Sequence, residues 1–532
     1  MRVVVVGSGA SGVHFAQTAL ARGHQVTLLD VGRERPAAPA PEAAFDELKS
    51  ELDDPVRYFL GADFEAAVLP GDGGEFYGLP ASQRFVLDTT SQHASRESGF
   101  HSLTSHARGG LAEAWTGGVY PLNDGELADF PFRFADLAPH YEEVARRIGI
   151  AVVDDDLARF MPLPEARQQP LALDGASARL LAAYERRRAA FHAAGCYAGR
   201  SRLAVSSAPR ADRGECTYLG RCLLGCPRDA LYTPSLSLRH LLTEPDFRYV
   251  PGAFVSHCQW DRARRVTGVV VARPDGGEEL VAADAVALAA GALSTARIVL
   301  DSVRRASGEI LVLDGLMDNQ QILVPFLHLG SLGRAPEMRS YQYHQVCLGL
   351  ADDDPREYVH VQLTMLKTAI VHPIIQRLPG GLVDGTRIFR LLRGALGVAN
   401  VNLSDSRRGD CQATIEPRAG APSTLVLSYR PAPGDEERTA RAERRVARAL
   451  GRLGCLVPPG LSHRRPKGAS VHYAGLIPMG GAAAPLTAGA DGESRDVGGL
   501  YFADGVTFPF LPAKNLTLTL MANAVRVARA AL

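Results

Sequence analysis

The first thirty residues carry the feature that most constrains the fold. A short apolar run, Val3 to Val6, leads directly into Gly7-Ser8-Gly9-Ala10-Ser11-Gly12, which is a G-x-G-x-x-G motif. The pattern predicts a buried parallel strand, then a helix over His14 to Arg22 that ends at Gly23. A second strand is expected over Gln25 to Asp30, which completes the start of a βαβ unit. This order is typical of a Rossmann-type nucleotide-binding fold.

The spacing of the glycines matches what a bound pyrophosphate requires. Gly7 permits a tight turn, Gly9 lets the backbone approach the phosphates, and Gly12 lets the helix pack closely on the strand. Asp30 ends the second strand, where such folds carry an acid that binds a ribose. A plain strand–turn–helix is the alternative interpretation. The motif by itself does not distinguish FAD from NAD.

Composition excludes several other classes of protein. The 532 residues include 58 Lys plus Arg and 58 Asp plus Glu, so the basic excess of a nucleic-acid-binding protein is missing. Most of the eight cysteines are scattered singly, unlike those of a secreted disulfide scaffold. We find neither a signal-peptide pattern nor an apolar stretch of about 18 residues. We therefore expect a cytoplasmic protein that does not insert into a membrane.

The hydrophobic pattern predicts several further elements. Helices are expected over residues 134–148, 436–453 and 515–532, and strands over residues 266–272, 285–288, 358–366 and 423–429. Residues 91–118, rich in Gly, Ser and His, are predicted to be a loop.

Five segments spread over most of the chain resemble the motifs of one family. They are Arg108 to Ala112 with Trp115 to Gly118, Phe130 to Phe132 with Asp136 to Tyr141, Ala289 to Arg297, Leu316 to Asn319, and Tyr501 to Gly505 with Asn515 to Thr519. In this order they resemble the motifs of the glucose–methanol–choline (GMC) family of FAD-dependent oxidoreductases. The first is similar to the family's second glycine motif, which lies along the flavin.

This resemblance implies that the bound nucleotide is FAD. Asp504 would meet the ribityl chain, and the backbone of Val255 would contact the adenine. Together, the N-terminal motif and the resemblance give the expected cofactor-binding residues: Gly7, Gly9, Ala10, Ser11, Gly12, Asp30, Arg108, Gly109, Gly110, Trp115, Thr116, Gly117, Val255, Ala290, Gly291, Asp504, Gly505, Leu516 and Thr517.

The resemblance also implies the catalytic residues. Val471 to Gly475, followed by Met479 and Gly480, is similar to the family's catalytic strand, and its base matches His472. The second active-site position of the family matches Asn515. A neutral imidazole suits removal of a hydroxyl proton, and a carboxamide can donate a hydrogen bond to a developing alkoxide.

The match in the catalytic strand is incomplete. Leu476 and Pro478 stand where the family usually has Thr and Arg, so the substrate pocket is expected to be unusual. The alternative for His472 is a core histidine without a catalytic role.

Two possible metal sites are rejected on spacing. Cys216, Cys222 and Cys226 have the spacing of an iron–sulfur run, but Leu219 stands in the second ligand position. The loop histidines His93, His101 and His106 lack a further ligand at zinc-binding spacing, and we interpret them as solvated or flavin-side residues. No bound metal is therefore expected.

The attachment of FAD is predicted to be non-covalent. Some family members bond FAD to a histidine that immediately precedes a tryptophan in the second glycine motif. Here Ala114 precedes Trp115, so a histidine link is not expected at this position.

The expected fold is α/β, with a discontinuous Rossmann-type FAD-binding domain and a β-sheet-based substrate-binding domain. The FAD domain would comprise residues 1–150, 200–318 and 468–532, and the substrate domain residues 151–199 and 319–467. The expected activity is oxidation of a C–OH group on a small alcohol, sugar or natural-product intermediate. The electron acceptor stays open.

A flavin-retaining biosynthetic enzyme, such as a lyase or cyclase, is the main alternative. An NAD-dependent dehydrogenase would need a second nicotinamide site, for which we find no motif. A binding protein without activity is disfavoured, because His472 and Asn515 both match the family's active-site positions.

Overall fold

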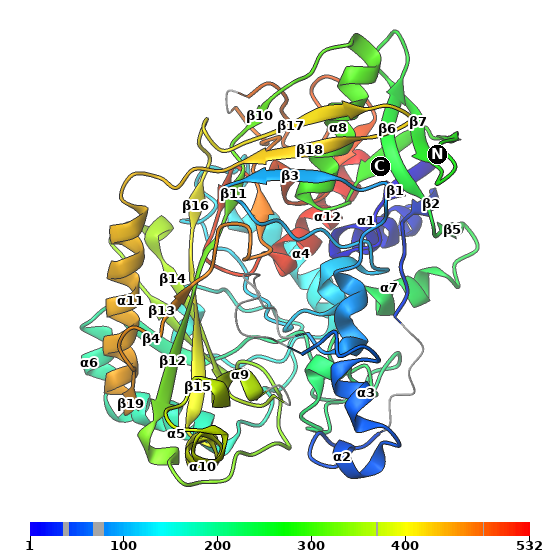
Figure 1. The fold of residues 1–532 in the computed structure, drawn as a ribbon. Helices are drawn as coiled ribbons and strands as arrows, with labels where there is room; N and C mark the ends of the chain where they lie inside the picture. Colours follow the sequence, from blue (N-terminus) through cyan, green and yellow to red (C-terminus); the bar gives the residue numbers. More distant parts are fainter. Residues whose placement is uncertain (36–41, 68–78, 369–370, 482–483) are drawn as a thin grey trace.

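The computed structural model describes residues 1–35, 42–67, 79–368, 371–481 and 484–532 (Figure 1). The N-terminal βαβ prediction is confirmed. Strand β1 (Arg2–Val6) leads into helix α1 (Ala10–Ala21), and β2 (Gln25–Leu29) returns parallel to β1. The helix begins earlier than predicted, because extended Gly9 is its N-cap and the next residue is already helical.

A five-stranded parallel sheet gathers strands from distant parts of the sequence. Its order is β22 (Leu500–Phe502), β9 (Ala285–Leu288), β1, β2 and β5 (Phe247–Val250). This sheet confirms the predicted α/β fold with a discontinuous Rossmann-type part.

Both faces of the parallel sheet are apolar and covered. Alternate residues of β1 enter different cores: Val3 and Val5 face α1, α7 (Pro234–Leu241) and α12 (Thr517–Ala531), whereas Val4 and Val6 face the other side. On that other side lie α8 (Ala292–Ser307) and a small antiparallel sheet of β6 (Phe254–Trp260), β7 (Val266–Ala272) and β8 (Glu278–Ala282). Helices α1 and α12, from the two ends of the chain, pack side by side (Figure 1).

A seven-stranded antiparallel sheet forms the second part of the molecule. Its strands are β4 (Cys196–Arg200), β12 (Gln320–His328), β13 (Val346–Leu350), β14 (Val359–Met365), β15 (Leu396–Leu403), β19 (Cys455–Leu456) and β20 (His463–Arg464). Helices α5 (Gly175–Arg186) and α11 (Asp435–Arg452) pack on one of its faces through apolar residues. The opposite face carries buried polar side chains, including Gln321, His360, Gln362 and Asn402.

The remaining elements connect these sheets. They are α2 (Leu48–Glu51), α3 (Pro55–Leu60), β3 (Ser95–Ser98), α4 (Phe134–Ile148), α6 (Arg188–His192), β10 (Leu313–Asp314), β11 (Met317–Asp318), α9 (His372–Gln376), α10 (Leu382–Leu392), β16 (Asp405–Ser406), β17 (Gln412–Arg418), β18 (Ala421–Ser428), β21 (Tyr473–Ala474) and β23 (Phe510–Leu511). In the part of the chain that the structure describes, no helix is long and apolar enough to cross a membrane.

The structure and the sequence prediction differ at residues 91–118. Helix 134–148 and strands 266–272 and 285–288 have the predicted bounds. The loop prediction over 91–118 was wrong at β3, which pairs parallel with β18. Its residues Ser95 to Ser98 are polar and mostly exposed, so no alternation in the sequence marks the strand. The domain boundaries proposed from the sequence remain a prediction.

Candidate active site

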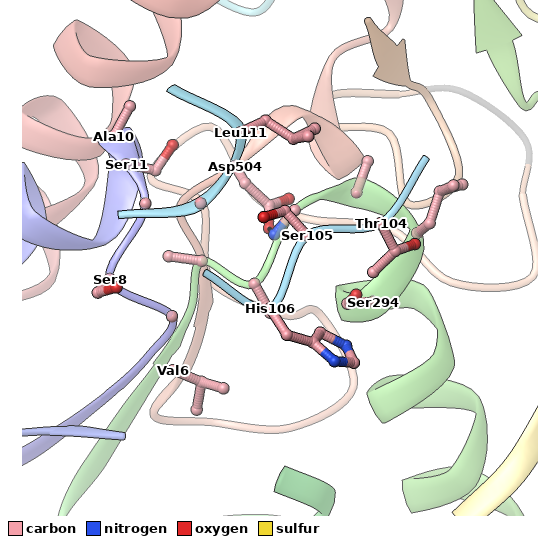
Figure 2. Close-up of a pocket in the computed structure, with 18 of the residues that line it drawn as sticks. Val6, Ser8, Ala10, Ser11, Thr104, Ser105, His106, Leu111, Ser294 and Asp504 are labelled. Atoms are coloured by element: carbon pink, nitrogen blue, oxygen red, sulfur yellow. Dashed lines mark hydrogen bonds between the residues drawn. The ribbon is translucent and has the colours of Figure 1, made fainter. Parts of the chain in front are cut away.

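One cavity opens where the carboxyl ends of the central parallel strands meet the starts of several helices. It encloses about 1400 Å³ of empty space, part of which is open to solvent. Figure 2 shows Ser8, Ala10, Ser11, His106 and Asp504 around it. Fifteen sequence-predicted site residues line this cavity: Gly7, Gly9, Ala10, Ser11, Asp30, Gly109, Gly110, Val255, Ala290, Gly291, His472, Asp504, Gly505, Leu516 and Thr517.

Six predicted residues do not line the cavity: Gly12, Arg108, Trp115, Thr116, Gly117 and Asn515. Gly12 packs α1 against the turn, where a Cβ atom would overlap the carbonyl oxygen of Gly7. Arg108 points away to an ion pair with Glu34, with 3.0 Å between Nη1 and Oε1.

Three of these six are engaged within the protein. Trp115 donates from Nε1 to the carbonyl of Tyr232 at 2.7 Å. Thr116 Oγ1 lies 3.1 Å from His344 Nε2. Gly117 has a φ of 65°, and a Cβ atom there would lie 2.6 Å from Leu231. These three residues therefore would not contact a ligand in the cavity and would support its wall instead.

Three helices begin at the cavity wall. The first residues of α1, α8 and α12 all line it. In the described part of the chain, none of these helices has a side-chain hydrogen bond at its N-cap or an acidic residue in its first turn. The first N–H groups and positive dipole ends of α1 and α12 are thus available to an anionic or electron-rich ligand, whereas the N-cap N–H of α8, on Gly291, already donates to Asp504.

Asp30 lies at the end of the cavity formed by β1 and β2. Its Oδ2 accepts hydrogen bonds from Ser8 Oγ and, at 3.3 Å, from the hydroxyl of Tyr249. Ser8 in turn accepts from the backbone N–H of Gly109 at 2.8 Å, which links the two glycine motifs. Burial raises the pKa of Asp30 to about 7, and these donors oppose the shift.

Asp504 is held at the other end of the same wall. Its Oδ2 accepts from the N–H of Gly291 at 3.0 Å and from Thr295 Oγ1 at 2.6 Å, and its Oδ1 accepts from Val506 at 3.0 Å. Burial raises the pKa of this carboxyl to about 6. Asp504 therefore ties β22 to the start of α8 as well as lining the cavity.

Sequence reasoning missed part of the wall. Residues 103–107 line the cavity between the two glycine motifs, as do Ser8 and Ser294. Of the three loop histidines, His93 and His106 line the cavity, whereas His101 is exposed. Burial lowers the pKa of His106 to about 4, so its ring is neutral near pH 7. The unusual density of Ser and His in this loop was the available signal.

His472 faces the cavity from the segment before β21. Its Nδ1 lies 2.9 Å from Oδ1 of Asn319, and its backbone N–H donates to Ser470 Oγ at 3.0 Å. Burial, assisted by the nearby positive charge of Arg465, lowers the pKa of the ring to about 4. The imidazole is therefore neutral at pH 7 and able to accept a proton.

Asn515 lies just before α12, outside the cavity wall. Its Oδ1 accepts a hydrogen bond from Gln362 Nε2 on β14 at 2.9 Å. The neighbouring Lys514 is fully buried and donates to the carbonyl oxygens of Pro121, at 3.0 Å, and Phe160, at 2.6 Å. These bonds fix the backbone that carries Asn515.

The three clustered cysteines occupy a separate region. Cys216, Cys222 and Cys226 are partly buried, are free of disulfide bonds and pack beside Tyr341. Burial raises the pKa of Cys222 well above its usual value and that of Cys216 to about 11. Among the described residues, no group of three or more His, Cys, Asp or Glu side chains has a geometry suited to a metal ion.

Comparisons with known proteins bear on the whole chain. No family model matches it. It is 24% identical to 6'''-hydroxyparomomycin C oxidase of Streptomyces lividus over 558 residues, covering 99% of this chain and 90% of that protein. It is also 24% identical to paromamine 6'-oxidase of Streptomyces fradiae, with the same coverage. An uncharacterized GMC-type oxidoreductase of Mycobacterium tuberculosis is 27% identical over 59% of this chain and 50% of its own length.

Solved structures share the fold. Pyridoxine 4-oxidase from Mesorbium loti matches with a TM-score of 0.62 and 15% identity, covering 99% of this chain and 98% of that one. A formate oxidase matches with a TM-score of 0.59 and 13% identity, covering 99% and 97%. The predicted resemblance is therefore confirmed: in sequence this chain is similar to a GMC-type oxidoreductase and to aminoglycoside oxidases, and it shares its fold with these solved oxidases.

Proposed function

We propose that this chain is an FAD-dependent oxidoreductase that oxidises a C–OH group, with His472 as the base. One observation carries the proposal. The neutral ring of His472 lines the same cavity as the G-x-G-x-x-G turn and the starts of three helices. A nucleotide held by the turn and the helix ends would thus share its chamber with a group able to accept a proton.

The residues of the cavity fit FAD. The turn at Gly7 to Ser11 and the N-terminus of α1 would hold the pyrophosphate, and Asp30 the adenosine ribose. Val255 lines the wall and would contact the adenine through its backbone; its carbonyl also accepts from Arg297 at 2.6 Å. Asp504 and the start of α12 would meet the ribityl chain and the flavin ring.

Non-covalent attachment is the form of binding that this sequence favours. Ala114 occupies the position of the histidine that links FAD in some relatives of the family. It packs with Leu79, Phe85 and Leu223 and does not line the cavity. Denaturation should therefore release the flavin from the polypeptide.

The chemistry divides between the cofactor and the protein. When bound, the flavin supplies a hydride acceptor. His472 takes the hydroxyl proton at Nε2, because its Nδ1 is engaged by Asn319. Asn515 donates a hydrogen bond to the oxygen on which negative charge develops.

The substrate is proposed to be a hydroxylated small molecule, with amino-sugar alcohols as the first candidates. The two relatives that align with 99% of this chain are named as oxidases of hydroxyparomomycin and paromamine. Leu476 and Pro478 stand where the family usually has Thr and Arg, which favours a substrate pocket that differs from those of the relatives. We also propose a cytoplasmic location, since all eight cysteines are free thiols suited to a reducing compartment.

An anaerobic substrate screen tests this proposal. Purified protein should be yellow, and its flavin band should bleach with one of paromamine, a neutral monosaccharide or pyridoxine. Air then separates an oxidase, which recovers its colour quickly, from a dehydrogenase, which does not. A protein that cannot be reconstituted with FAD would contradict the proposal. So would product formation without flavin reduction, the result expected of a lyase or cyclase.

A further inference from the structure

We propose that two buried carboxamides, Asn319 and Gln362, fix which atom of His472 accepts a proton and which atom of Asn515 donates one. The inference rests on the proposed function and goes beyond it. Both are positioning residues, and neither lines the cavity. Each touches one of the two side chains assigned to the chemistry, at 2.9 Å in both cases.

The amide of Asn319 can point only one way. Its Nδ2 donates to the carbonyl oxygens of Leu403, at 2.8 Å, and Pro512, at 2.9 Å. A rotated amide would place its oxygen against both carbonyls, and neither can donate. Oδ1 therefore faces His472, and Nδ1 of the ring must carry the hydrogen. This tautomer leaves the lone pair on Nε2, which is the atom available to take a substrate proton.

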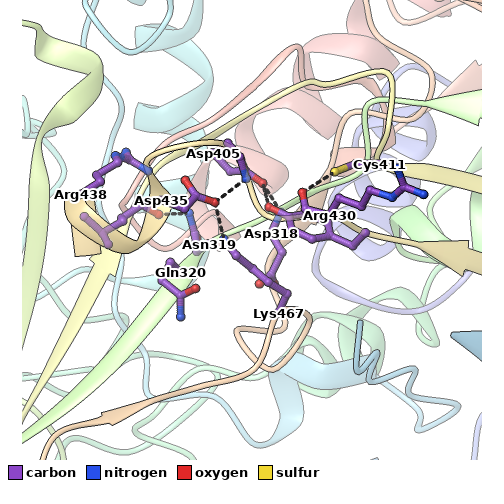
Figure 3. A network of polar contacts seen from close by, with 12 residues as sticks. Asp318, Asn319, Gln320, Asp405, Cys411, Arg430, Asp435, Arg438 and Lys467 are labelled. Atoms are coloured by element: carbon purple, nitrogen blue, oxygen red, sulfur yellow. Dashed lines mark hydrogen bonds and ion pairs between the residues drawn. The ribbon is translucent and has the colours of Figure 1, made fainter. Parts of the chain in front are cut away.

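The backbones that carry the two partners are tied together. Strands β11 and β21 pair antiparallel, with Asp318 opposite Tyr473. Ser470 Oγ donates to Asp318 Oδ1 and accepts from the N–H of His472. The N–H of Asp318 donates to Asp405 at 2.9 Å, and Figure 3 shows Asn319 next to this pair in a network of polar contacts. The Asn319–His472 contact therefore does not depend on a mobile side chain.

Gln362 plays the complementary part for Asn515. Its Nε2 donates to Asn515 Oδ1 at 2.9 Å and lies 3.3 Å from the hydroxyl of Tyr120. Because Oδ1 of Asn515 is the accepting atom, its Nδ2 is turned to the other side as the donor. Gln362 is only 3% exposed, so water does not compete for this bond. Asn319 thus enforces an acceptor at the site, and we assign to Gln362 the part of holding Asn515 as a donor.

The two positioning residues belong to, or directly precede, strands of the seven-stranded sheet. Gln362 stands on β14, and Asn319 immediately precedes β12. The seven-stranded sheet would then set the polarity of the catalytic groups as well as form a wall. A catalytic histidine in the wrong tautomer, or one whose orienting partner is lost, commonly loses a large part of its activity.

Paired substitutions test the inference in flavin-loaded protein. Asn319→Leu should slow anaerobic substrate-driven flavin reduction about 10–100-fold with little change in the substrate concentration needed for half-saturation. Asn319→Asp keeps an acceptor at Nδ1 and should recover much of the rate. It should also move the acidic limb of the pH profile upward, because a carboxylate stabilises the charged ring.

The second pair separates polarity from packing. Gln362→Met removes the donor, whereas ionised Gln362→Glu presents only acceptors and should turn the Asn515 amide around. Gln362→Glu should therefore be slower than Gln362→Met at alkaline pH. A steric role would give both variants the same rate, which would overturn the assignment for Gln362.

Controls distinguish failure of the inference from failure of the proposed function. Asn523→Leu removes a buried carboxamide that bonds Arg526 on α12 and should leave the rate unchanged. Flavin content is measured for every variant, so that misfolding is not read as loss of rate. If Asn319→Leu is reduced at the wild-type rate while His472→Ala is slow, the inference is overturned and the proposed function is retained. Normal reduction in His472→Ala would overturn both it and the proposed function.

Discussion

The two large sheets of this protein differ in how they use their faces. The five-stranded parallel sheet is apolar on both sides, and its contribution to the site comes from the loops and helix starts at its strand ends. The seven-stranded sheet packs one apolar face beneath α5 and α11. Its other face is polar and reaches Asn515 through Gln362. In the proposed mechanism, the first sheet would hold the cofactor at the carboxyl ends of its strands, whereas the second would act through its polar face.

Because the two sheets differ in this way, we expect changes in different places to affect cofactor binding, folding stability and reaction rate separately. Changes at the strand ends of the first sheet should abolish cofactor binding. Changes on the apolar face of the second sheet should cost folding free energy, and changes on its polar face should cost rate.

The largest effect is expected from Gly12→Val. The added side chain would overlap the carbonyl oxygen of Gly7, a backbone atom that cannot move without opening the turn. We expect loss of all bound flavin, measured by absorbance after purification. Gly451→Val is a control, since a Cβ there meets nothing within 4 Å. Retention of flavin by Gly12→Val would show that this turn does not hold the phosphates of FAD.

On the apolar face of the second sheet, Leu348→Ala should destabilise the protein by about 2–5 kcal/mol, the usual effect of truncating a buried leucine. Leu348 is fully buried beneath the helices. Urea unfolding followed by circular dichroism measures the change. The flavin reduction rate at 25 °C should stay within a factor of about two, and a larger loss would contradict the separation of the two faces.

Protonation of His472 should contribute little to the pH dependence of flavin reduction. The pKa of His472 is lowered to about 4 by burial, so the base is unprotonated above that pH. This group should change the rate less than about twofold between pH 8 and pH 5.5, whereas Asp504 and Asp30, with pKa values raised to about 6 and 7, titrate inside that interval. A histidine of ordinary pKa would add about a tenfold loss. A tenfold loss with a midpoint near 6.5 in wild type that is absent in His472→Ala would show that burial does not shift this group.

The smallest effect is expected from Cys222→Ser. This thiol lies with Cys216 and Cys226 beside Tyr341, away from the cavity wall. The visible spectrum and the reduction rate should both match those of the wild type. Iron and acid-labile sulfide in stoichiometric amounts, lost in this variant, would instead identify a cluster.

Short sequence motifs were enough to predict much of the fold and part of the site. The glycine motif, the strand before it and Asp30 lie within thirty residues, and their order was enough to predict the nucleotide-binding turn. The family motifs led to His472 and Asp504, both of which line the cavity. Arg108 carried the same kind of motif signal, yet it turns to Glu34. A motif fixes the path of the backbone better than the direction of a long side chain.

The rest of the site depends on contacts between distant residues. Asn319 and His472 are separated by 153 positions, as are Gln362 and Asn515. Neither pair can be read from a periodic pattern, because only the folded sheet brings its members together. Strand β3 escaped prediction for a related reason: its pairing with β18 needs no apolar alternation.

The role of His472 as the base is tested by anaerobic stopped-flow reduction of the flavin by substrate in wild type and His472→Ala. The substrate is whichever alcohol bleaches the wild-type flavin. We expect the variant to retain FAD but to be reduced about 10²–10⁴-fold more slowly, the usual contribution of a positioned acid–base group. Equal rates in the two proteins would remove His472 as the base and contradict the mechanism.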